Sequence, residues 1–391
     1  MHTPVASDTT IEAIADLASS AGLSHIHMLA WRDLDDDEAG GSEIHAHNIA
    51  SIWAQAGVRV TMRTSAVTGE PATRVRQGYT ASRKGGRFDV FLRSPLSEII
   101  GRLGPCDGLV EIWNGMPFWS PLWWRGPRTI WLHHVHGPMW AQTLPGPVAK
   151  VGNTIEEHIA PKLYRHQPIV TLSQSSRDEL VDELGFDSDK VTVITPGVDP
   201  FFSPGGQRSR TPLAVAVGRL TPVKDFPRLV RIMAAVRERV PDARLVIVGE
   251  GYERDRILDT IASLDAGGYI ELAGRVSDDA LRDLYRSAWV VTSASTREGW
   301  GMTLTEAAAC GAPSVASDIS GHADAIARGR SGLLGSTDAE LSGLLTDVLT
   351  DGELRARLQA GALARAEELS WENSALANFE VLAADARRRR P

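Results

Sequence analysis

The amino-acid sequence predicts an α/β protein made of two domains of similar size, each built around a parallel sheet. Three observations support this prediction. The chain has 391 residues, about 2.6 times the ~150 residues of one typical domain. Strand-like segments alternate with helix-like segments of roughly 8–15 residues, which is the pattern of parallel βαβ units. A stretch rich in proline and glycine, at 196–206, separates two such alternating regions.

Composition narrows the functional classes. Hydrophobic residues make up 43% and charged residues 23%, as in folded globular proteins. The formal net charge of −8 disfavours a nucleic-acid partner. Cys106 and Cys310 are far apart and lack CxxC spacing, so neither a disulfide framework nor a cysteine zinc site is expected, and the cytoplasm is the simplest location. No stretch approaches the ~18 apolar residues of a membrane span, and 1–13 does not resemble a signal peptide.

The first alternating region begins with a predicted strand at 25–32. A glycine-rich loop at 39–42 follows it, and then a helix that reaches about Ala56. Helical spacing places four apolar residues on one face of that helix: Ile49, Ile52, Trp53 and Ala56. A second strand at 58–64 completes a βαβ unit.

The second region repeats this alternation of strands and helices from Leu213. A strand at 213–220 precedes a helix at about 225–240. Further strands are expected at 243–249, 269–273, 289–293 and 314–317, and helices at 255–264, 279–287 and 304–310. Parallel sheets bind ligands beyond the carboxyl ends of their strands, so the loops at those ends are the places to search for a site.

These boundaries predict a first domain at 1–200 and a second domain at 201–370, with sheets facing across a cleft. In the segment 371–391 we expect a helix that could cross back to the first domain. The segment contains the run Arg387–Arg390. Its preferred interpretation is a solvated, frayed tail. The alternative is a peripheral contact with anionic lipid, worth ~1 kcal/mol per basic residue.

The strongest local motif is the nine-residue stretch from Glu298 to Glu306, EGWGMTLTE. It lies between a predicted strand and a predicted helix, where backbone N–H groups can bind an anion. Gly299 and Gly301 let a phosphate or sugar approach the backbone, and the two carboxylates suit hydroxyl groups. For Glu306 there is a structural alternative, because Thr303-x-x-Glu306 also fits a capping box.

A second motif, Gly218 to Lys224, follows another strand. Arg219 and Lys224 suit a diphosphate, since arginine binds oxygens bidentately and lysine supplies a point charge. For this motif taken alone, an ordinary surface charge pair near a helix start is the preferred interpretation. Two further strand ends carry glycines, at 249–251 and at Gly274-Arg275-Val276. Four such junctions in succession predict one shared crevice.

Together with Gly40-Gly41-Ser42-Glu43, these motifs resemble the retaining GT-B glycosyltransferases of family four. The resemblance covers nearly the whole chain in the same order. It is closest in character to actinobacterial members, including the phosphatidylinositol mannosyltransferases. It implies transfer of a hexose, with retention and without metal or cofactor, from a nucleoside diphosphate sugar to a hydroxyl acceptor. The donor would be GDP-mannose, UDP-glucose or UDP-N-acetylglucosamine, and the acceptor a sugar, a lipid-linked molecule or a small molecule.

The resemblance also implies roles for individual residues. Arg219 and Lys224 would hold the diphosphate, and Glu298 would contact the donor sugar. Glu306 would bind the ribose diol. The remaining donor contacts would come from Gly274, Arg275 and Val276 around the base, from Gly41 and Ser42 in the first domain, and from the backbone of Gly299, Trp300, Gly301, Met302, Thr303 and Leu304. Trp300 stands where the family usually has Phe and Met302 where it has Leu, both apolar changes.

A histidine cluster, LHHVH at 132–136, follows the strand that begins at Thr129. In the family, a histidine here lies beside the reacting carbon. Counting from Pro127, His133 matches best and His134 is the second choice. Neighbouring residues of a strand face opposite sides, so only one of the two can point into the cleft. A core role is the structural alternative. A metal site using His133 and His136 lacks an obvious third ligand.

Two other features allow more than one interpretation. The acidic run Asp33–Asp37 contains DxD spacing, but a solvated loop is preferred to a metal site. Six of the eleven tryptophans lie between Trp113 and Trp140, and aromatic faces can stack on an acceptor. The candidates for such a wall are Trp119, Trp123, Trp124 and Trp140.

Three other functions are compatible with this sequence. A sugar-nucleotide epimerase or a glycan phosphorylase could use the same architecture, the latter with a pyridoxal phosphate lysine. A non-catalytic protein that binds nucleotide sugars is the third. Release of nucleoside diphosphate from a donor in the presence of acceptor separates a transferase from a binding protein.

Overall fold

The computed structural model describes residues 4–137, 139–143 and 145–390. Two compact units make up the chain. The C-terminal unit is Val198–Leu369. The N-terminal unit consists of residues 4–197 together with 370–390. The proline- and glycine-rich stretch therefore contains the point where the chain passes from one unit to the other.

The N-terminal unit contains a sheet in the order β3-β4-β2-β1-β5-β6-β7-β8. All neighbouring strands are parallel except β3 and β4, which form an antiparallel edge. The strands are β1 (His25–Leu29), β2 (Arg59–Thr64), β3 (Thr73–Arg76), β4 (Tyr79–Arg83), β5 (Gly108–Trp113), β6 (Arg128–Leu132), β7 (Ile169–Thr171) and β8 (Val191–Val193).

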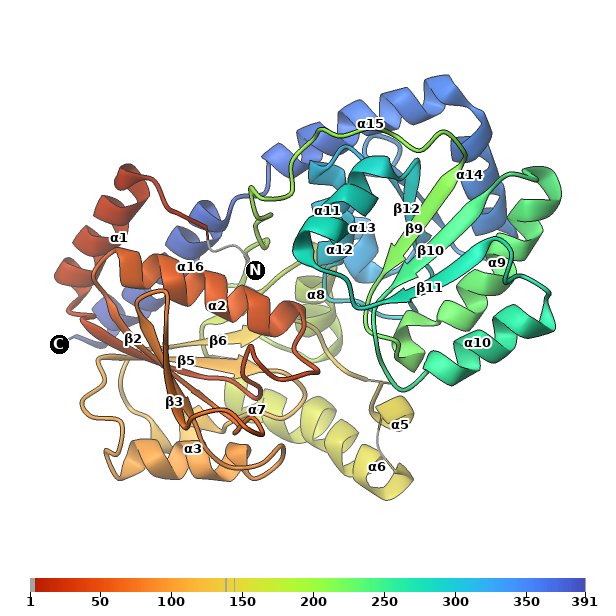
Figure 1. Cartoon of the computed structure of the whole chain (residues 1–391). Helices are drawn as coiled ribbons and strands as arrows, with labels where there is room; N and C mark the ends of the chain where they lie inside the picture. Colours follow the sequence, from red (N-terminus) through yellow and green to blue (C-terminus); the bar gives the residue numbers. More distant parts are fainter. Residues whose placement is uncertain (1–3, 138, 144, 391) are drawn as a thin grey trace. The chain divides into compact units, whose positions relative to one another are not determined.

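Helices and helical turns connect these strands (Figure 1). They are α1 (Asp8–Ala21), α2 (Gly41–Gln55), α3 (Val90–Ile99), α4 (Ser120–Trp123), α5 (Met139–Thr143), α6 (Gly146–Thr154), η1 (Ile155–Ile159), α7 (Ala160–Tyr164), α8 (Gln174–Asp178), η2 (Glu179–Glu183) and α16 (Trp371–Arg389). The predicted apolar face of α2 is confirmed, because Ile49, Ile52 and Trp53 are all 0% exposed. The last helix, α16, packs on α1 and α2, and the Trp53 indole donates to the Ala375 carbonyl at 2.9 Å.

The arginine run at 387–390 corrects an expectation. It is not frayed, since α16 continues to Arg389. Arg388 and Arg389 bond to Asp385, and Arg390 Nη1 donates to the Ser20 carbonyl at 2.8 Å. Asp385 lies three and four residues before these two arginines, and opposite charges at this spacing stabilise the end of the helix. Among the described residues, no helix combines the length and the low polarity needed to cross a bilayer.

The C-terminal unit contains a sheet of six parallel strands in the order β11-β10-β9-β12-β13-β14. Its strands are β9 (Leu213–Val217), β10 (Arg244–Val248), β11 (Ile270–Gly274), β12 (Val290–Ser293), β13 (Ser314–Ser317) and β14 (Gly332–Gly335). Its helices are η3 (Pro222–Lys224), α9 (Phe226–Arg239), α10 (Arg254–Ser263), α11 (Asp278–Ser287), α12 (Met302–Ala309), α13 (Ser320–Ala325), α14 (Asp338–Thr350) and α15 (Gly352–Glu367). Two parallel α/β sheets, as the sequence predicts, are confirmed.

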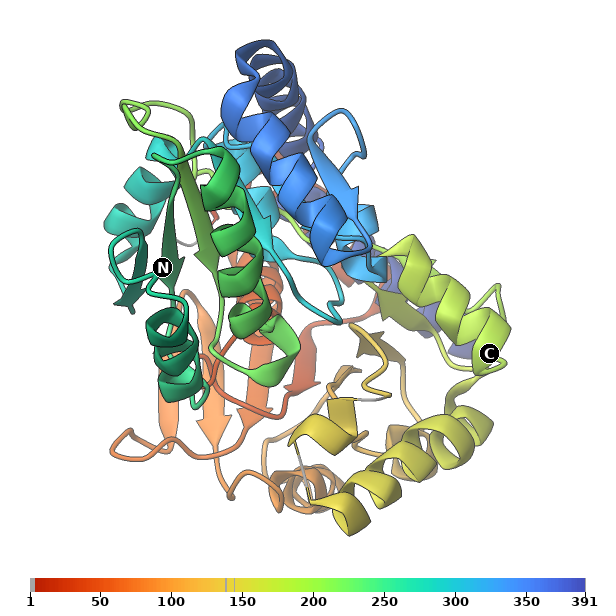
Figure 2. The ribbon, with the colours of Figure 1, turned by 90° about the vertical axis from the view of Figure 1, so that its right-hand side faces the viewer.

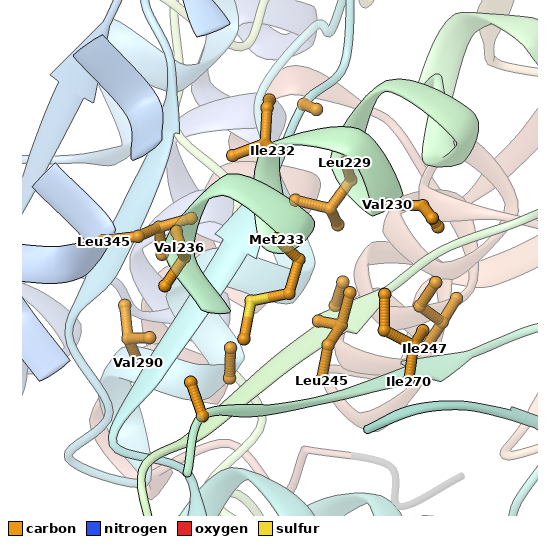
Figure 3. Close-up of a cluster of buried hydrophobic side chains, with 14 of the residues drawn as sticks. Leu229, Val230, Ile232, Met233, Val236, Leu245, Ile247, Ile270, Val290 and Leu345 are labelled. Carbon is orange, nitrogen blue, oxygen red and sulfur yellow. The ribbon is translucent and has the colours of Figure 1, made fainter. Parts of the chain in front are cut away.

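The core of the C-terminal unit lies between α9 and its sheet. Leu229, Val230 and Met233 of α9 point toward Leu245 and Ile247 of β10 (Figure 3). The helix α14 packs beside α9 (Figure 2). Burying a side chain of this kind stabilises the fold by about 1.5–3 kcal/mol. This packing fixes the carboxyl ends of the strands, where the candidate site lies.

Candidate active site

An ion pair joins two of the residues singled out from the sequence. Lys224 ends the short turn η3 after β9, and Glu298 lies in the loop after β12. Lys224 Nζ donates to Glu298 Oε1 at 2.5 Å, and Ser295 Oγ donates to the same oxygen at 2.8 Å. Burial opposes ionisation of Glu298, but Lys224 and His322 outweigh it and lower its pKa to about 2. The carboxylate is therefore ionised throughout the neutral range.

The glycine turn between Glu298 and α12 is held by the neighbouring helix α13. A Cβ on Gly321 would lie 2.4 Å from the Glu298 carbonyl oxygen, so backbone packs on backbone there. Gly301 has φ +120° and precedes α12, and a Cβ on it would lie 3.3 Å from His322 Cδ2. The N-cap residue, Gly301, has no side chain to cap this end of α12, and the first N–H groups of a helix can bind an anion.

Sequence reasoning missed Ser295, Gly321 and His322 as parts of this turn. His322 is 1% exposed, and its Nδ1 lies 3.0 Å from the Ser317 carbonyl oxygen. These residues come from the loop after β12 and from α13. Ser295 lies only three residues before Glu298 in the same loop. Gly321 and His322 lie more than 20 residues further along the chain, and the pairing of β12 with β13 brings them to Glu298.

The capping-box interpretation of Thr303 and Glu306 is wrong. The helix α12 begins at Met302 after Gly301, so Thr303 lies inside the helix and cannot be its N-cap. Glu306 instead accepts a hydrogen bond from the buried Tyr285 hydroxyl at 3.2 Å. Burial, together with the charges of Asp199 and Asp278, outweighs the Tyr285 bond and raises the pKa of Glu306 to about 8. The two glutamates of the motif thus have opposite protonation tendencies.

Glu306 should make the unliganded protein sensitive to alkaline pH. Its pKa lies above the ordinary 4.5 when folded, so the folded chain holds a proton that the unfolded chain releases. Stability should therefore fall as pH rises from about 4.5 to about 8, by up to ~1.4 kcal/mol per pH unit. Glu306→Gln cannot ionise, so we expect its Tm to exceed that of the wild type at pH 9 and to match it at pH 5. Thermal unfolding across pH measures this difference.

A glutamate on an exposed helix end provides the control for this experiment. Glu367→Gln, near the end of α15, should follow the wild-type pH profile. If Glu306→Gln shows the same decline toward pH 9 as the wild type, the ionisation of Glu306 does not limit stability.

Three strand ends of the C-terminal unit meet at glycines. A Cβ on Gly249 would lie 1.9 Å from the Gly218 carbonyl oxygen, and one on Gly274 would lie 2.7 Å from Glu250 Oε1. The Gly249 N–H donates to the Gly274 carbonyl at 2.9 Å. The loops after β9, β10 and β11 therefore lie side by side, as predicted. Arg219 and Arg275 are exposed at this edge; Val276 is half-buried and packs against the core.

In the N-terminal unit, the predicted glycine loop leads directly into α2. Gly40 is extended, and its N–H donates to Glu43 Oε2 at 2.8 Å. Gly41 is exposed and Ser42 is half-buried, both in the first turn of α2. The backbone N–H groups of a helix start are thus available at these two residues.

The acidic run before this loop is not a solvated loop. Asp33 is 0% exposed, and its Oδ1 lies 2.7 Å from Arg76 Nη2 and 2.8 Å from Arg83 Nη2. Asp35 pairs with the same arginines and with Arg74 at 2.5 Å. Burial opposes ionisation of Asp33, yet the arginine bonds lower its pKa to about 2. The hairpin of β3 and β4 supplies all three arginines, so the DxD carboxylates serve to anchor the loop.

The histidines that follow β6 differ in burial. His133 is 4% exposed, and its ring lies 4.9 Å from that of His45 inside the unit. Burial, with His45 and His134, lowers its pKa well below the ordinary value. His134 is half-buried and stacks on His136 at 4.8 Å with 20° between the rings. His133, which follows the end of β6 at Leu132, is therefore packed inside the unit, whereas His134 and His136 are half-buried.

The four tryptophans considered as an acceptor-binding surface mainly pack within the N-terminal unit. Trp140 is 7% exposed, and its indole donates to Glu156 Oε2 at 2.9 Å. Trp123 and Trp124 are half-buried and donate to backbone carbonyls at 2.8 and 2.9 Å. Trp119 is half-buried against Tyr164. The expectation of an exposed acceptor surface is thus wrong for Trp140, whose ring is buried.

Both units match known protein families. Residues 199–365 match the family described as "Glycosyl transferases group 1", and residues 39–201 match "Glycosyltransferase Family 4". The chain is similar to a D-inositol 3-phosphate glycosyltransferase of Stackebrandtia nassauensis, with 29% identity over 384 residues that cover 86% of this chain and 85% of the relative.

Solved structures show the same fold. Sucrose-phosphate synthase from Thermosynechococcus elongatus aligns with a TM-score of 0.79 and 18% identity over 91% of this chain and 98% of its own. Anabaena Alr3699/HepE, in complex with UDP and glucose, aligns with a TM-score of 0.71 and 16% identity over 92% of this chain and 100% of its own. At these identities the likeness establishes the architecture alone.

Proposed function

This chain belongs to glycosyltransferase family 4, with a group 1 domain in its C-terminal unit, and from this premise we propose that it transfers a hexose from a nucleoside diphosphate sugar to a hydroxyl acceptor with retention. The observation that supports the proposal most directly is the Lys224–Glu298 pair beside the uncapped glycine turn of α12. It combines a fixed cation, open N–H groups and a carboxylate, which suit a diphosphate and sugar hydroxyls.

In the proposed reaction, Arg219 and Lys224 bind the diphosphate, and the start of α12 adds its N–H groups. Charge that develops on the departing diphosphate is stabilised there, at roughly 3–4 kcal/mol per preorganised donor. Glu298 accepts hydroxyl groups of the sugar, and Glu306 those of the ribose. The departing diphosphate takes the acceptor proton on the face from which it leaves, which accounts for retention.

The N-terminal unit contributes the remaining parts of the proposal. Gly41 and Ser42 offer N–H groups at the start of α2, and a histidine after β6 contacts the reacting sugar. We assign this contact to His134 or His136, because both are less buried than His133. The relatives' names make D-inositol 3-phosphate the first acceptor to test. No metal is required in this proposal, since Asp33 and Asp35 are engaged by arginines.

Ligand binding tests the donor part of the proposal. We expect GDP or UDP to raise the Tm more than ADP, because a ligand at ~100 times its Kd adds roughly 2.7 kcal/mol of stability. Donors incubated with acceptor should then release nucleoside diphosphate, and EDTA should leave the rate unchanged. Binding without release would indicate a non-catalytic protein, and rescue of an EDTA-treated enzyme by Mn²⁺ would contradict the metal-independent mechanism.

A further inference from the structure

A buried glutamate holds the segment that follows β6. Glu156 Oε1 accepts the His136 backbone N–H at 2.8 Å. Its Oε2 accepts the Gly137 N–H and the Trp140 indole N–H, both at 2.9 Å. The Glu156 side chain is 2% exposed. Burial opposes its ionisation, but the bonds from His136 and Gly137 lower its pKa below the ordinary value. One carboxylate thus fixes three donors of a single loop.

The segment held in this way carries a stack of rings. The His136 ring lies 4.8 Å from His134 and 5.2 Å from Trp140. Its Nδ1 lies 3.6 Å from Glu156 Oε1. On the other side, a Cβ on Gly115 would lie 3.3 Å from His136 Nε2, so the ring covers the loop after β5. It therefore lies at the carboxyl ends of two adjacent parallel strands, where α/β domains bind ligands.

The element that carries Glu156 is itself unusual. The helix α6, the π-helical turn η1 and α7 follow one another without a break from 146 to 164 (Figure 2). Glu156 lies in η1, and π turns inside helices occur frequently at functional sites. On α6, a Cβ on Gly152 would lie 2.7 Å from the Trp140 ring, so the backbone packs directly on the indole.

Packing alone does not require a charge at this position. A buried carboxylate is costly unless donors satisfy it, and an apolar residue would fill the same space without that cost. Two of the three donors here are the backbone N–H groups of His136 and Gly137, so the charge fixes the backbone that carries the His136 ring. We propose that Glu156 is a positioning residue for glycosyl transfer, which fixes the His136 imidazole at the edge of β5 and β6 where the reacting sugar binds.

This inference rests on the proposed function and goes beyond it to one residue. The residues proposed to bind the diphosphate and ribose, apart from Gly41 and Ser42, lie in the C-terminal unit, whereas Glu156 and His136 lie in the N-terminal unit. Glu156 should therefore determine the rate of transfer and not the affinity for the nucleotide. This separation distinguishes a positioning role from a merely structural one.

The test uses the full chain and three variants: Glu156→Gln, Trp140→Phe and Glu157→Gln. Nucleoside diphosphate release from UDP-glucose, UDP-N-acetylglucosamine and GDP-mannose, with D-inositol 3-phosphate as acceptor, gives kcat and the donor KM. Thermal shifts with UDP and GDP give nucleotide binding. For Glu156→Gln we expect kcat to fall about 10- to 100-fold, since small misplacements of reacting groups have effects of this size. Donor KM and the nucleotide thermal shift should stay within about 2-fold.

Trp140→Phe tests the same role in case Glu156→Gln folds poorly, and Glu157→Gln is the control. Trp140→Phe removes one of the three bonds and retains a packed ring, so a smaller fall in kcat is expected even where Glu156→Gln folds poorly. Glu157→Gln, on the same turn but more exposed (36%), should match the wild type. An unchanged kcat in both Glu156→Gln and Trp140→Phe would overturn the proposal, as would an equal loss of kcat and nucleotide binding. A wild-type chain that binds nucleotide but releases none from any donor, with D-inositol 3-phosphate or with other sugar, lipid-linked and small-molecule hydroxyl acceptors, would overturn the proposed function, and this inference with it.

Discussion

Replacing Lys224 with alanine is expected to lower kcat by about 100-fold or more, because one preorganised cation at a leaving diphosphate contributes on this scale. Lys224 lies at the carboxyl end of β9, and its side chain passes over Gly218, whose added Cβ would be 3.3 Å from Lys224 Cε. Its Nζ bonds Glu298. The variant therefore also leaves a mostly buried carboxylate that still accepts a hydrogen bond from the Ser295 hydroxyl. We expect the pKa of Glu298 to rise and nucleotide affinity to fall.

Nucleoside diphosphate release and nucleotide titration measure these effects, and circular dichroism checks the fold. Lys190→Ala removes a surface lysine paired with its neighbour Asp189 and should leave all three measurements unchanged. A cycle of Lys224→Ala, Glu298→Gln and the double variant isolates the coupling between the two residues. If Lys224→Ala retains wild-type turnover, charge neutralisation by Lys224 is not part of the mechanism.

Replacing Asp33 with alanine should destabilise the protein by roughly 3–5 kcal/mol, because it leaves buried cations without their carboxylate. Asp33 and Arg83 are both 0% exposed, and Arg76 is 8% exposed. These pairs join the loop after β1 to the hairpin of β3 and β4. The same loop leads into Gly40 and Gly41, so we also expect a loss of turnover at temperatures where the fold persists. Chemical denaturation measures the change in free energy of unfolding.

The pairing also predicts a contribution to acid unfolding. The pKa of Asp33 is lowered from 3.8 to about 2 in the folded chain. Its contribution is therefore present above the ordinary pKa and is lost as pH falls from about 4 to about 2, by about 2 kcal/mol. Asp37→Ala, at an exposed position of the same run, is the matched control. Equal stability of Asp33→Ala and Asp37→Ala would show that the buried pairs do not stabilise the loop.

Much of the fold could be predicted from local sequence. The alternation of apolar runs and helical periodicity located α2, α9 and the strands β9 to β13 of the C-terminal unit, because each of these elements buries one face of its own; the last strand, β14, was not predicted. The antiparallel hairpin of β3 and β4 was not predicted. Its exposed β3 lacks an apolar alternation, and it is held by Arg76 and Arg83 bonding to a carboxylate some 40 to 50 positions away.

Some features of the candidate site could likewise be predicted from local sequence, and others could not. Glycines at strand ends, paired carboxylates and nearby cations are local signals, and they identified Lys224, Glu298 and Glu306 without a structure. Apart from Ser295, the partners of these residues are not local. Sheet order and helix packing bring Tyr285 to Glu306 and His322 to Glu298, so no spacing in the sequence predicts these contacts. The same holds for His133, since its side chain direction depends on where β6 ends.

The sequence alone predicted the class of protein, two parallel α/β sheets, and the chemical groups available at the edges of these sheets. Tertiary structure alone decided the charge that each group holds. Glu298 beside Lys224 is ionised, Glu306 beside Tyr285 retains a proton near neutrality, and the acidic run anchors a loop. The physical reason is that ionisation depends on burial and on neighbours in space, which residues distant in the chain provide.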